Sequence, residues 1–327
     1  MRICTISHSH IALRQQLFFR EVAKQGHDVL MISPGQWRDL RTENQRTHYD
    51  SGGDFGLVTC RHMGGENIYT YHLLGAQALV EDFKPDWLYV QAEPGSVTSD
   101  QALQWKVDKR ALFTWENIHL MGSNSLRSYD LIVCGNADAE ALVKPHNRNT
   151  ALMLQVGVDT DHFQARPDVL RNVKVAYIGR RTPEKGLPYL IKAWPTAYLL
   201  DWKDYKELPW WYSQVEVVVA YSQDIPQWRE QAPNYVVLEA LSCGCKAVVS
   251  TTAAMVGWLA GCPGVTFVEG HEQPDEHLDP VKVDALREGI NLALGEQFSA
   301  QPEARDMVIE RFSNVAVARK LLEVMGA

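Results

Sequence analysis

The chain alternates short apolar segments with amphipathic segments along most of its length, and this alternation constrains its fold more than any other feature. Strands are predicted at 2–7, 27–32, 56–60, 87–91, 111–115, 131–134 and 151–156, then at 173–178, 196–200, 215–220, 246–250 and 265–268. Helices are predicted at 13–24, 71–83, 98–109 and 138–144, and roughly the last 50 residues follow a helical pattern that ends in 315–325. Such alternation predicts parallel strands joined by crossover helices. Sheets of this kind bind ligands at the carboxyl ends of their strands.

The length of the chain predicts two α/β domains. It has 327 residues, whereas a single hydrophobic core stops growing beyond about 250–300 residues. The junction is predicted near 157–163, so we expect an N-terminal domain over 1–156 and a second domain over 157–310. The C-terminal helix, 311–327, is expected to pack back toward the first domain.

Charge and cysteine content narrow the functional classes. The net charge is -8, which disfavours the broad phosphate-neutralising face that nucleic-acid binding needs. Four of the six cysteines lie in apolar runs, which predicts reduced, buried thiols and a cytoplasmic location. Residues 1–7 predict a first strand, and no apolar run approaches the ~20 residues that span a bilayer. Peripheral contact with the inner face of a membrane stays open, with Trp210 and Trp211 as its anchors.

A short loop rich in glycine and cations follows the first strand of the second series. It reads Gly179-Arg180-Arg181-Thr182-Pro183-Glu184-Lys185-Gly186. Glycine lets the backbone approach a ligand closely, and Arg180 and Lys185 in one loop can clasp a diphosphate. Fixed cations stabilise a diphosphate leaving group as its charge grows, and they remove the need for a divalent metal. The alternative is a solvated turn with ordinary surface charges.

The segment 227–245 places two acidic positions on either side of a helix start. Glu239 lies on the predicted helix between apolar neighbours, where a buried acid needs a partner. Its carboxylate could accept both hydrogen bonds of a ribose diol, while Glu230 or Gln231 would meet sugar hydroxyls. The first helical N–H groups favour phosphate oxygens, and the residues at that helix start are Asn234, Tyr235 and Val236. The alternative for Glu239 is an acid on a helix surface.

Together these segments resemble the motifs of family 4 of the retaining glycosyltransferases, whose GT-B fold has two Rossmann-like domains. Residues 178–186 resemble the phosphate motif of the family, and 222–244 resemble its acid-to-acid motif. Residues 157–163 resemble its interdomain loop. Residues 92–94, 113–117 and 134–136 resemble a bacterial branch of the family. The likeness covers nearly the whole chain.

The resemblance implies transfer of a hexose-like sugar from a nucleotide diphosphate sugar, with retention at the anomeric carbon. The second domain would bind the donor. Its diphosphate would meet Gly179, Arg180 and Lys185, its ribose Glu239, and its sugar the first acid of the motif. The donor phosphate would act as the base, so no enzymatic general base would be required. Neither a cofactor nor a metal is implied. A UDP-sugar is favoured by its frequency in the family, and a GDP-sugar comes next.

The chain departs from the family in two places. Eight residues separate Glu230 from Glu239, whereas the family has one fewer between its acids. We favour an insertion after Glu230, which keeps Glu230 as the first acid; the alternative is that Gln231 takes its place. The stretch 187–211 is too short for a strand–helix unit that the family usually has there, which predicts a reduced second domain. The sheet left bare would be covered by tryptophans, namely Trp194, Trp202, Trp210, Trp211 and Trp228.

Polar residues also follow strands of the first domain, where the family binds its acceptor. The loop after the first strand carries Ser7, His8, Ser9 and His10, and Arg14 lies one turn into the next helix. Later strands are followed by Glu93, Glu116, Asn117 and His119. We expect acceptor or phosphate contacts from this set, and the candidate catalytic residues are Glu230, Gln231, Glu116 and His10. The alternatives are a helix start capped by Ser9 and ordinary surface positions.

The leading hypothesis is therefore a metal-independent hexosyltransferase. Its acceptor is predicted only as a glycan, a lipid-linked molecule or a small molecule, because the net charge of -8 disfavours nucleic acid. Two alternatives stay open: a nucleotide-sugar-binding protein without catalysis, and a glycosyltransferase of viral type that modifies nucleic acid. The sequence predicts no oligomeric state.

Overall fold

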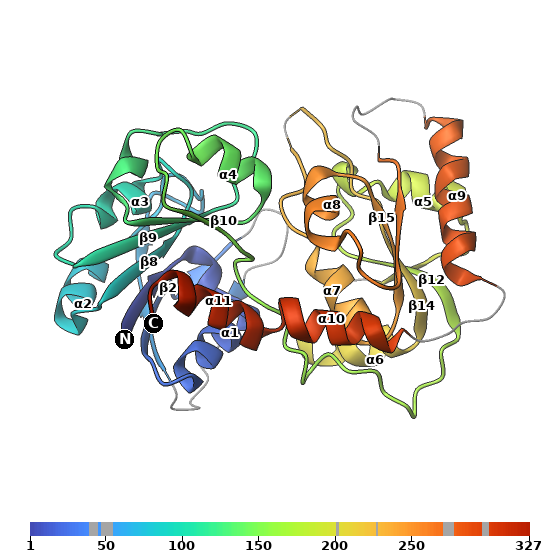
Figure 1. Cartoon of the computed structure of the whole chain (residues 1–327), viewed down its shortest axis with the longest axis horizontal. Helices are drawn as coiled ribbons and strands as arrows, with labels where there is room; N and C mark the ends of the chain where they lie inside the picture. Colours follow the sequence, from blue (N-terminus) through green and yellow to red (C-terminus); the bar gives the residue numbers. More distant parts are fainter. Residues whose placement is uncertain (39–44, 47–54, 201–202, 227, 271–277, 296–300) are drawn as a thin grey trace. The chain divides into compact units, whose positions relative to one another are not determined.

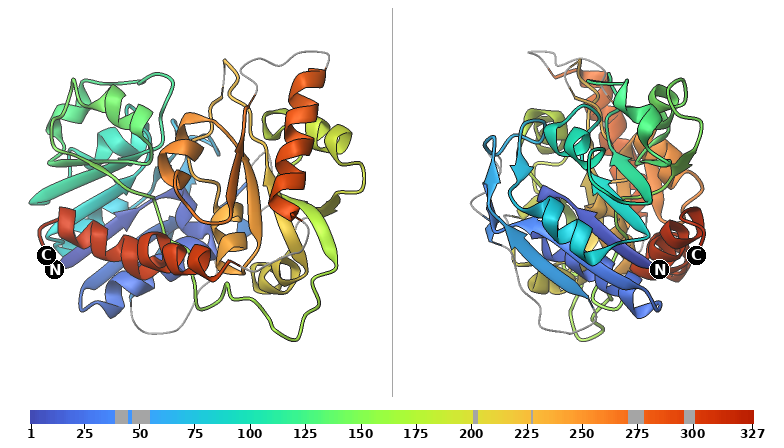
Figure 2. Two further views of the ribbon diagram at one scale, coloured as in Figure 1. Left: turned by 45° about the vertical axis from the view of Figure 1, so that its right-hand side comes forward. Right: turned by 90° about the vertical axis from the view of Figure 1, so that its left-hand side faces the viewer.

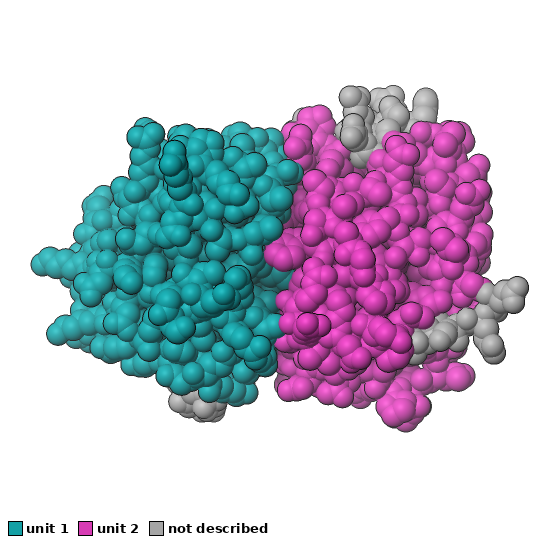
Figure 3. Space-filling model, in the orientation of Figure 1, with its two compact units in different colours: residues 1–157, 314–327 teal, residues 158–313 magenta. Residues whose placement is uncertain are grey.

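The computed structural model describes residues 1–38, 45–46, 55–200, 203–226, 228–270, 278–295 and 301–327. These residues form two α/β units, which are coloured separately in Figure 3. Unit 1 comprises Met1–Gly157 and Asn314–Ala327, and unit 2 comprises Val158–Ser313. The chain thus enters unit 2 at the start of the segment 157–163 and returns to unit 1 at its last helix.

Unit 1 is built on a parallel sheet that has seven strands among the described residues, in the order β11-β10-β9-β8-β1-β2-β5. The strands are β1 (Arg2–Ile6), β2 (Asp28–Pro34), β5 (Gly56–Cys60), β8 (Trp87–Gln91), β9 (Lys109–Thr114), β10 (Leu131–Cys134) and β11 (Thr150–Leu152). The central strands are buried on both faces, as apolar runs in a parallel sheet require. The right-hand view of Figure 2 shows the twist of this sheet.

Helices and two short strand pairs complete unit 1. The helices are α1 (Leu13–Lys24), α2 (Ala76–Phe83), α3 (Val97–Ala102), α4 (Ala137–Val143) and α11 (Asn314–Val324). The strand pairs, both antiparallel, are β3 (Gln36–Trp37) with β4 (Gln45–Arg46) and β6 (His62–Met63) with β7 (His72–Leu73). Two 3-10 turns are η1 (His8–Ile11) and η2 (Ser125–Ser128).

The C-terminal helix α11 packs on α1 and belongs to unit 1 (Figure 1). One face of α11 is buried. Gln25, at the end of α1, donates from Nε2 to Val315 O at 3.4 Å. Trp87, at the start of β8, donates from Nε1 to Met325 O at 3.0 Å. Side chains from two distant parts of the sequence therefore fasten this helix to unit 1.

Unit 2 is built on a parallel sheet whose described strands number five, in the order β13-β12-β14-β15-β16. The strands are β12 (Val173–Ile178), β13 (Tyr198–Leu200), β14 (Val215–Ala220), β15 (Lys246–Ser250) and β16 (Val265–Val268). The helices are α5 (Leu187–Ala193), α6 (Leu208–Ser213), α7 (Tyr235–Ser242), α8 (Ala253–Leu259), α9 (Pro280–Leu294) and α10 (Pro302–Phe312). Helices α5 and α9 cover one face of the sheet, and α7 covers the other with α10 against it (Figure 1).

The stretch 187–211 supplies α5, the three-residue strand β13, the 3-10 turn η4 (Tyr205–Glu207) and most of α6. Trp211 stacks on Tyr198 of β13, with 5.9 Å between ring centroids and 14° between planes, so it covers this edge strand. Trp194 packs against the core of unit 2, Trp210 is 41% exposed, and Trp202 lies outside the described residues. No helix among the described residues is long and apolar enough to cross a bilayer.

Two predicted helices of unit 1 are shorter in the structure than in the prediction. The helix predicted over 71–83 begins at Ala76, because the residues before it pair as β7 and Gly75 adopts a left-handed φ of 79°. The helix predicted over 98–109 ends at Ala102. Its last carbonyl accepts a hydrogen bond from Arg110 Nε at 3.1 Å, which replaces the partner that a further helical turn would supply.

A single arginine fastens the junction segment to two helices of unit 2. Arg305, on α10, donates from its guanidinium to Phe163 O at 2.7 Å and to Thr160 O at 2.9 Å. It also donates to Ser242 O, at the end of α7, at 2.7 Å. The guanidinium has five donors in a fixed fork, which suits one side chain to several carbonyls at once.

We predict that Arg305→Ala lowers the free energy of unfolding by about 3 kcal/mol, because three backbone carbonyls lose a charged donor. Urea denaturation followed by circular dichroism measures the change. The exposed Arg319, on α11, is the matched control, and Arg319→Ala should stay within about 0.5 kcal/mol of the wild type. Equal stability of the two variants would show that Arg305 does not hold the junction.

Candidate functional site

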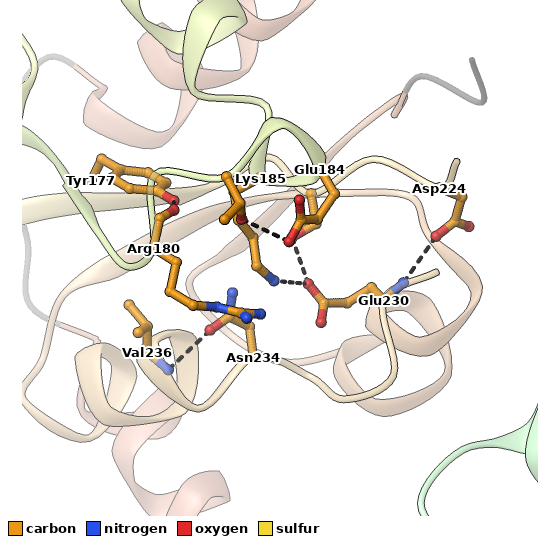
Figure 4. A network of polar contacts seen from close by, with 10 residues as sticks. Tyr177, Arg180, Glu184, Lys185, Asp224, Glu230, Asn234 and Val236 are labelled. Atoms are coloured by element: carbon orange, nitrogen blue, oxygen red, sulfur yellow. Dashed lines mark hydrogen bonds and ion pairs between the residues drawn. The ribbon is translucent and has the colours of Figure 1, made fainter. Parts of the chain in front are cut away.

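The carboxyl ends of β12 and β14 lie side by side, because these strands are parallel neighbours. β12 leads into the loop 179–186, and β14 leads to Ser222. Tyr177, near the end of β12, donates a hydrogen bond from its hydroxyl to the carbonyl of Arg180 (Figure 4). Burial raises the pKa of Tyr177 to about 12. The phenol therefore stays protonated at neutral pH and holds the start of the loop.

Lys185 and Glu230 form a nearly buried ion pair at this edge of the sheet (Figure 4). Lys185 Nζ lies 2.8 Å from Glu230 Oε2, and the two side chains are only 11% and 7% exposed. Ser222 donates from Oγ to the same carboxylate oxygen at 2.5 Å. The ammonium also lies 4.6 Å from the centroid of the Trp228 ring. Charges taken out of water need such partners, because their desolvation is costly.

Arg180 brings a second positive charge to the pair. Its side chain is half-buried, and its guanidinium makes no hydrogen bond or ion pair with another residue that the structure describes. Figure 4 shows the guanidinium pointing toward the Lys185–Glu230 pair and toward Asn234. A guanidinium keeps its charge at all relevant pH values. Arg180 is therefore a half-buried cation whose donors are available to an anion.

The start of α7 completes this edge of the site. Asn234 adopts a left-handed φ of 55°, a conformation that asparagine tolerates better than most residues. Its side-chain Oδ1 accepts a hydrogen bond from Val236 N at 3.3 Å and so caps the helix. Tyr235 and Val236 are half-buried in the first turn. Glu230 is the acid that contacts Lys185, while the next residue, Gln231, is half-buried beside it.

Glu239 is buried on α7 with a tyrosine as its partner. It is 1% exposed, and its Oε2 accepts a hydrogen bond from the hydroxyl of Tyr212 at 2.8 Å. Tyr212, on α6, is fully buried. Glu239, which the sequence predicts to bind the ribose, is therefore hydrogen-bonded to a protein hydroxyl in this structure. The hydroxyl of Tyr212 fixes one carboxylate oxygen and so orients the carboxylate.

The loop after β1 forms the turn η1, and Ser7 begins it. Ser7, rather than the predicted Ser9, is the capping residue, since its side chain accepts a hydrogen bond from Ser9 N at 3.0 Å. His8 N donates to the hydroxyl of Tyr71 at 3.0 Å. The half-buried His8 ring lies 4.8 Å from the ring of Trp37 and 5.5 Å from that of Tyr71, measured between centroids. His8 therefore sits on an aromatic support at the carboxyl end of the strand.

His10, a candidate catalytic residue from the sequence, lies in the core of unit 1. It is 0% exposed, its Nε2 is 2.9 Å from Thr5 Oγ1, and its ring packs edge-on against Phe19 at 5.2 Å. Burial, helped by the neighbouring His8, lowers the pKa of His10 to about 3. The imidazole is therefore neutral at physiological pH and has the surroundings of a structural residue.

Two carboxyl groups lie at the carboxyl ends of β8 and β9. Glu93 Oε2 accepts hydrogen bonds from Thr114 Oγ1 and from Glu116 N, the latter at 3.2 Å. Glu116 is 9% exposed and accepts a hydrogen bond from the hydroxyl of Tyr69 at 2.6 Å. Burial, with a contribution from the Glu116 charge, raises the pKa of Glu93 to about 7. This carboxyl can therefore exchange a proton near neutral pH.

The remaining predicted residues of unit 1 differ in exposure. Asn117 is buried, Arg14 is half-buried and His119 is exposed.

Four residues that hydrogen-bond to the carboxylates of the site were given no role by the sequence, namely Tyr212, Ser222, Tyr69 and Thr114. Ser222 and Thr114 stand at strand ends, a position that could have indicated them. The two tyrosines carry no pattern of their own, because only the tertiary fold brings them to their carboxylates.

No protein-family model and no curated protein matches this chain. Solved structures match it over nearly its whole length. Sucrose-phosphate synthase from Thermosynechococcus elongatus matches with a TM-score of 0.73 and 15% identity, over 99% of this chain and 98% of that one. Anabaena HepE in complex with UDP matches with a TM-score of 0.65 and 12% identity, over 99% of each chain. AviGT4, a glycosyltransferase involved in avilamycin A biosynthesis, matches with a TM-score of 0.66 and 13% identity, over 100% of this chain and 99% of that one.

At these identities the likeness establishes the fold alone. The two parallel-sheet units of this chain are the two Rossmann-like domains of the GT-B fold. The fold class predicted from the sequence is confirmed.

We predict that Gly186→Ala destabilises unit 2 by more than about 1 kcal/mol. Gly186 has a φ of 64°, and a Cβ there would lie 2.1 Å from the carbonyl oxygen of Tyr221. A Cβ added at Gly257, on α8, would meet no atom within 4 Å, so Gly257→Ala should be neutral or stabilising by up to about 1 kcal/mol. Thermal denaturation compares the variants, and a stable Gly186→Ala would rule out the tight turn.

We also predict that Glu93 makes the folded state less stable as pH rises. A folded carboxyl with a pKa of about 7 binds more protons than the unfolded one, whose pKa is near ~4.3. Stability should thus fall between those two values, by up to about 1.4 kcal/mol per pH unit. Glu93→Gln should flatten this dependence, whereas Glu303→Gln, at an exposed position of α10, should keep it. Urea denaturation at pH 4.5, 6 and 8 provides the test, and a wild-type slope in Glu93→Gln would contradict the account.

Proposed function

We propose that this protein is a glycosyltransferase that moves a hexose-like sugar from a nucleotide diphosphate sugar to an acceptor hydroxyl. One observation carries the proposal. Arg180 and Lys185 converge with the carboxylate of Glu230 at the carboxyl ends of β12 and β14. This is where doubly wound sheets bind their ligands, and the GT-B fold of the chain is consistent with the activity.

The two cations suit a diphosphate leaving group. As the bond between the sugar and the diphosphate breaks, negative charge grows on the leaving oxygen. Arg180 offers a planar fork of donors and Lys185 a compact charge. Cations held at that point stabilise the transition state more than the ground state. The proposal therefore assigns leaving-group stabilisation to protein side chains and needs no metal ion.

Glu230 and Glu239 are assigned to the rest of the donor. Glu230 would accept hydrogen bonds from hydroxyls of the sugar, and Glu239 would accept them from the ribose. Tyr212, 2.8 Å from Glu239 Oε2, would orient the second carboxylate. The start of α7, with Asn234, Tyr235 and Val236, would lie along the phosphates. UDP is the first choice of nucleotide, since solved structures of the GT-B neighbour HepE hold UDP and UDP-glucose; a GDP-sugar is the second.

We extend the proposal to stereochemistry. In the family 4 mechanism that the motifs of this chain resemble, the acceptor attacks from the face that the diphosphate leaves. A leaving phosphate oxygen then takes the proton of the acceptor hydroxyl. Configuration at the anomeric carbon is retained, and no side chain has to act as the base.

Unit 1 is assigned to the acceptor. The supporting observation is the set of polar groups at the carboxyl ends of β1, β8 and β9, where His8, Glu93 and Glu116 each have a hydrogen-bonding partner. A carboxyl whose pKa is about 7 can donate or accept a hydrogen bond near neutral pH. Hydroxyl-rich acceptors, such as glycans, fit such a set. The other contributors would be Ser9, Arg14, Asn117 and His119.

The experiment that tests this function is a thermal-shift screen of nucleotide diphosphates and nucleotide sugars, followed by an assay for donor hydrolysis. A ligand at 100 times its dissociation constant stabilises the protein by about 2.7 kcal/mol. We expect UDP-sugars to raise the melting temperature and free UDP to appear on incubation. Binding without release would support a non-catalytic nucleotide-sugar-binding protein, and no shift with any nucleotide would contradict the proposal.

We predict that Arg180→Ala and Lys185→Ala each weaken binding of a UDP-sugar by about 10-fold or more, because each removes a charged donor worth about 1.5–3 kcal/mol. Arg181→Ala is the matched control, since Arg181 is exposed in the same loop, and it should change affinity by less than about 3-fold. Isothermal titration calorimetry measures the affinities, with circular dichroism to check folding. If Arg180→Ala and Lys185→Ala bind the UDP-sugar as the wild type does, the diphosphate assignment is wrong.

A further inference from the structure

The cation that the proposed function assigns to the diphosphate is already engaged in the ligand-free protein. Lys185 Nζ contacts Glu230 Oε2 at 2.8 Å, and Ser222 Oγ donates to the same oxygen at 2.5 Å. The backbone of Glu230 is held as well, because its N–H donates to Asp224 Oδ1 at 3.1 Å. Glu230 is thus fixed from three sides with its charge against the ammonium.

A diphosphate that approaches Lys185 therefore meets a carboxylate in the place it would take. Both side chains of the pair are nearly buried, so their electrostatic interactions are only weakly screened. The incoming anion is attracted by Arg180 and Lys185 and is repelled by Glu230. Separating the pair is also costly, because a buried charge that loses its partner is strongly destabilising.

The ligand can offset this cost only if it offers Glu230 new donors. A bare diphosphate brings acceptor oxygens and no donors for a carboxylate. A sugar attached to the diphosphate brings hydroxyl groups, and a carboxylate accepts hydrogen bonds from them. Glu230 can then exchange the ammonium of Lys185 and the hydroxyl of Ser222 for sugar hydroxyls, while Lys185 turns to the phosphates.

We propose that Glu230 is a specificity-determining residue that blocks Lys185 until a ligand carries both a diphosphate and a sugar. This proposal rests on the proposed function and adds to it a discrimination against bare diphosphates. The same change of partners runs in reverse after transfer. Once the sugar has left, Glu230 returns to Lys185 and helps to expel the nucleoside diphosphate.

The test measures binding of inorganic pyrophosphate, a diphosphate without a sugar, to the purified full chain by isothermal titration calorimetry. Glu230→Gln should bind pyrophosphate at least about 10-fold more tightly than the wild type, because Lys185 is left without its counter-charge. Glu184→Gln is the matched control. It removes one negative charge from the same loop, near Arg180 and Lys185, but leaves the ion pair intact, so it should tighten binding by less than about 3-fold.

A second variant keeps the proposal testable if Glu230→Gln does not fold. Ser222→Ala removes a hydrogen bond that holds the carboxylate and leaves both charges in place. It should tighten pyrophosphate binding by a smaller factor, about 2- to 5-fold. The double variant Glu230→Gln with Lys185→Gln should lose the gain, because the cation that pyrophosphate would bind is gone.

Unchanged pyrophosphate affinity in Glu230→Gln and Ser222→Ala, or a gain in Glu184→Gln as large as in Glu230→Gln, overturns the exchange. Absence of pyrophosphate binding in all variants overturns it too. These outcomes are separate from those for the function. A protein that transfers sugar but shows no gain in Glu230→Gln keeps the transferase and loses the exchange. A protein that turns over no nucleotide sugar but shows the gain keeps Glu230 as a block on Lys185 at an anion site, and it loses both the transferase and the exchange for sugar hydroxyls.

Discussion

A lysine ammonium that is held almost out of water needs a counter-charge, and in unit 2 that charge is the carboxylate of Glu230. The local backbone is arranged to make this contact. Lys185 is presented by a loop that turns at Gly186, whose left-handed conformation leaves no room for a side chain against Tyr221. Glu230 arrives from the other side, after β14, and Ser222 at the end of that strand fixes its oxygen.

Hydrogen bonds of charged or buried side chains also connect other elements of unit 2. The helix α7 begins at Asn234, which caps it, and carries Glu239 on its buried face against Tyr212. Arg305 ties the end of α7 to the segment through which the chain enters the unit. The elements that present the proposed donor residues are therefore fastened to one another by hydrogen bonds of charged or fully buried side chains. Unit 1 offers a different chemistry, in which carboxyl and imidazole groups stand at the strand ends.

The sequence was sufficient to predict most of the sheets, because apolar strands buried on both faces leave a strong signal. It was weaker at the end of a helix: α3 ends at Ala102, whose carbonyl accepts a hydrogen bond from Arg110, and no local pattern indicates this contact. All six cysteines are buried and free, whereas the sequence placed only four of them in apolar runs that predict burial.

For the candidate site, spacing indicated which residues matter but not which of them pair. The loop 179–186 and the segment 227–245 each predicted ligand contacts. Neither predicted that Lys185 and Glu230 would contact each other, because the two residues lie 45 positions apart in the sequence. For His10, the position in the sequence suggested a role that the burial of its ring does not match. Its place after a strand favoured a functional role, while the fold turns its ring into the core beside Thr5. Burial is a property of the assembled unit, and a short loop sequence does not encode it.

Lys185 and Glu230 are proposed to bind a diphosphate sugar, and a crystal structure of the protein with a non-hydrolysable UDP-sugar tests this role most directly. The account predicts that Lys185 Nζ leaves Glu230 for a phosphate oxygen, that Arg180 joins it there, and that Glu230 accepts hydrogen bonds from hydroxyls of the sugar. A complex in which the ligand lies elsewhere while the 2.8 Å ion pair stays intact would contradict it.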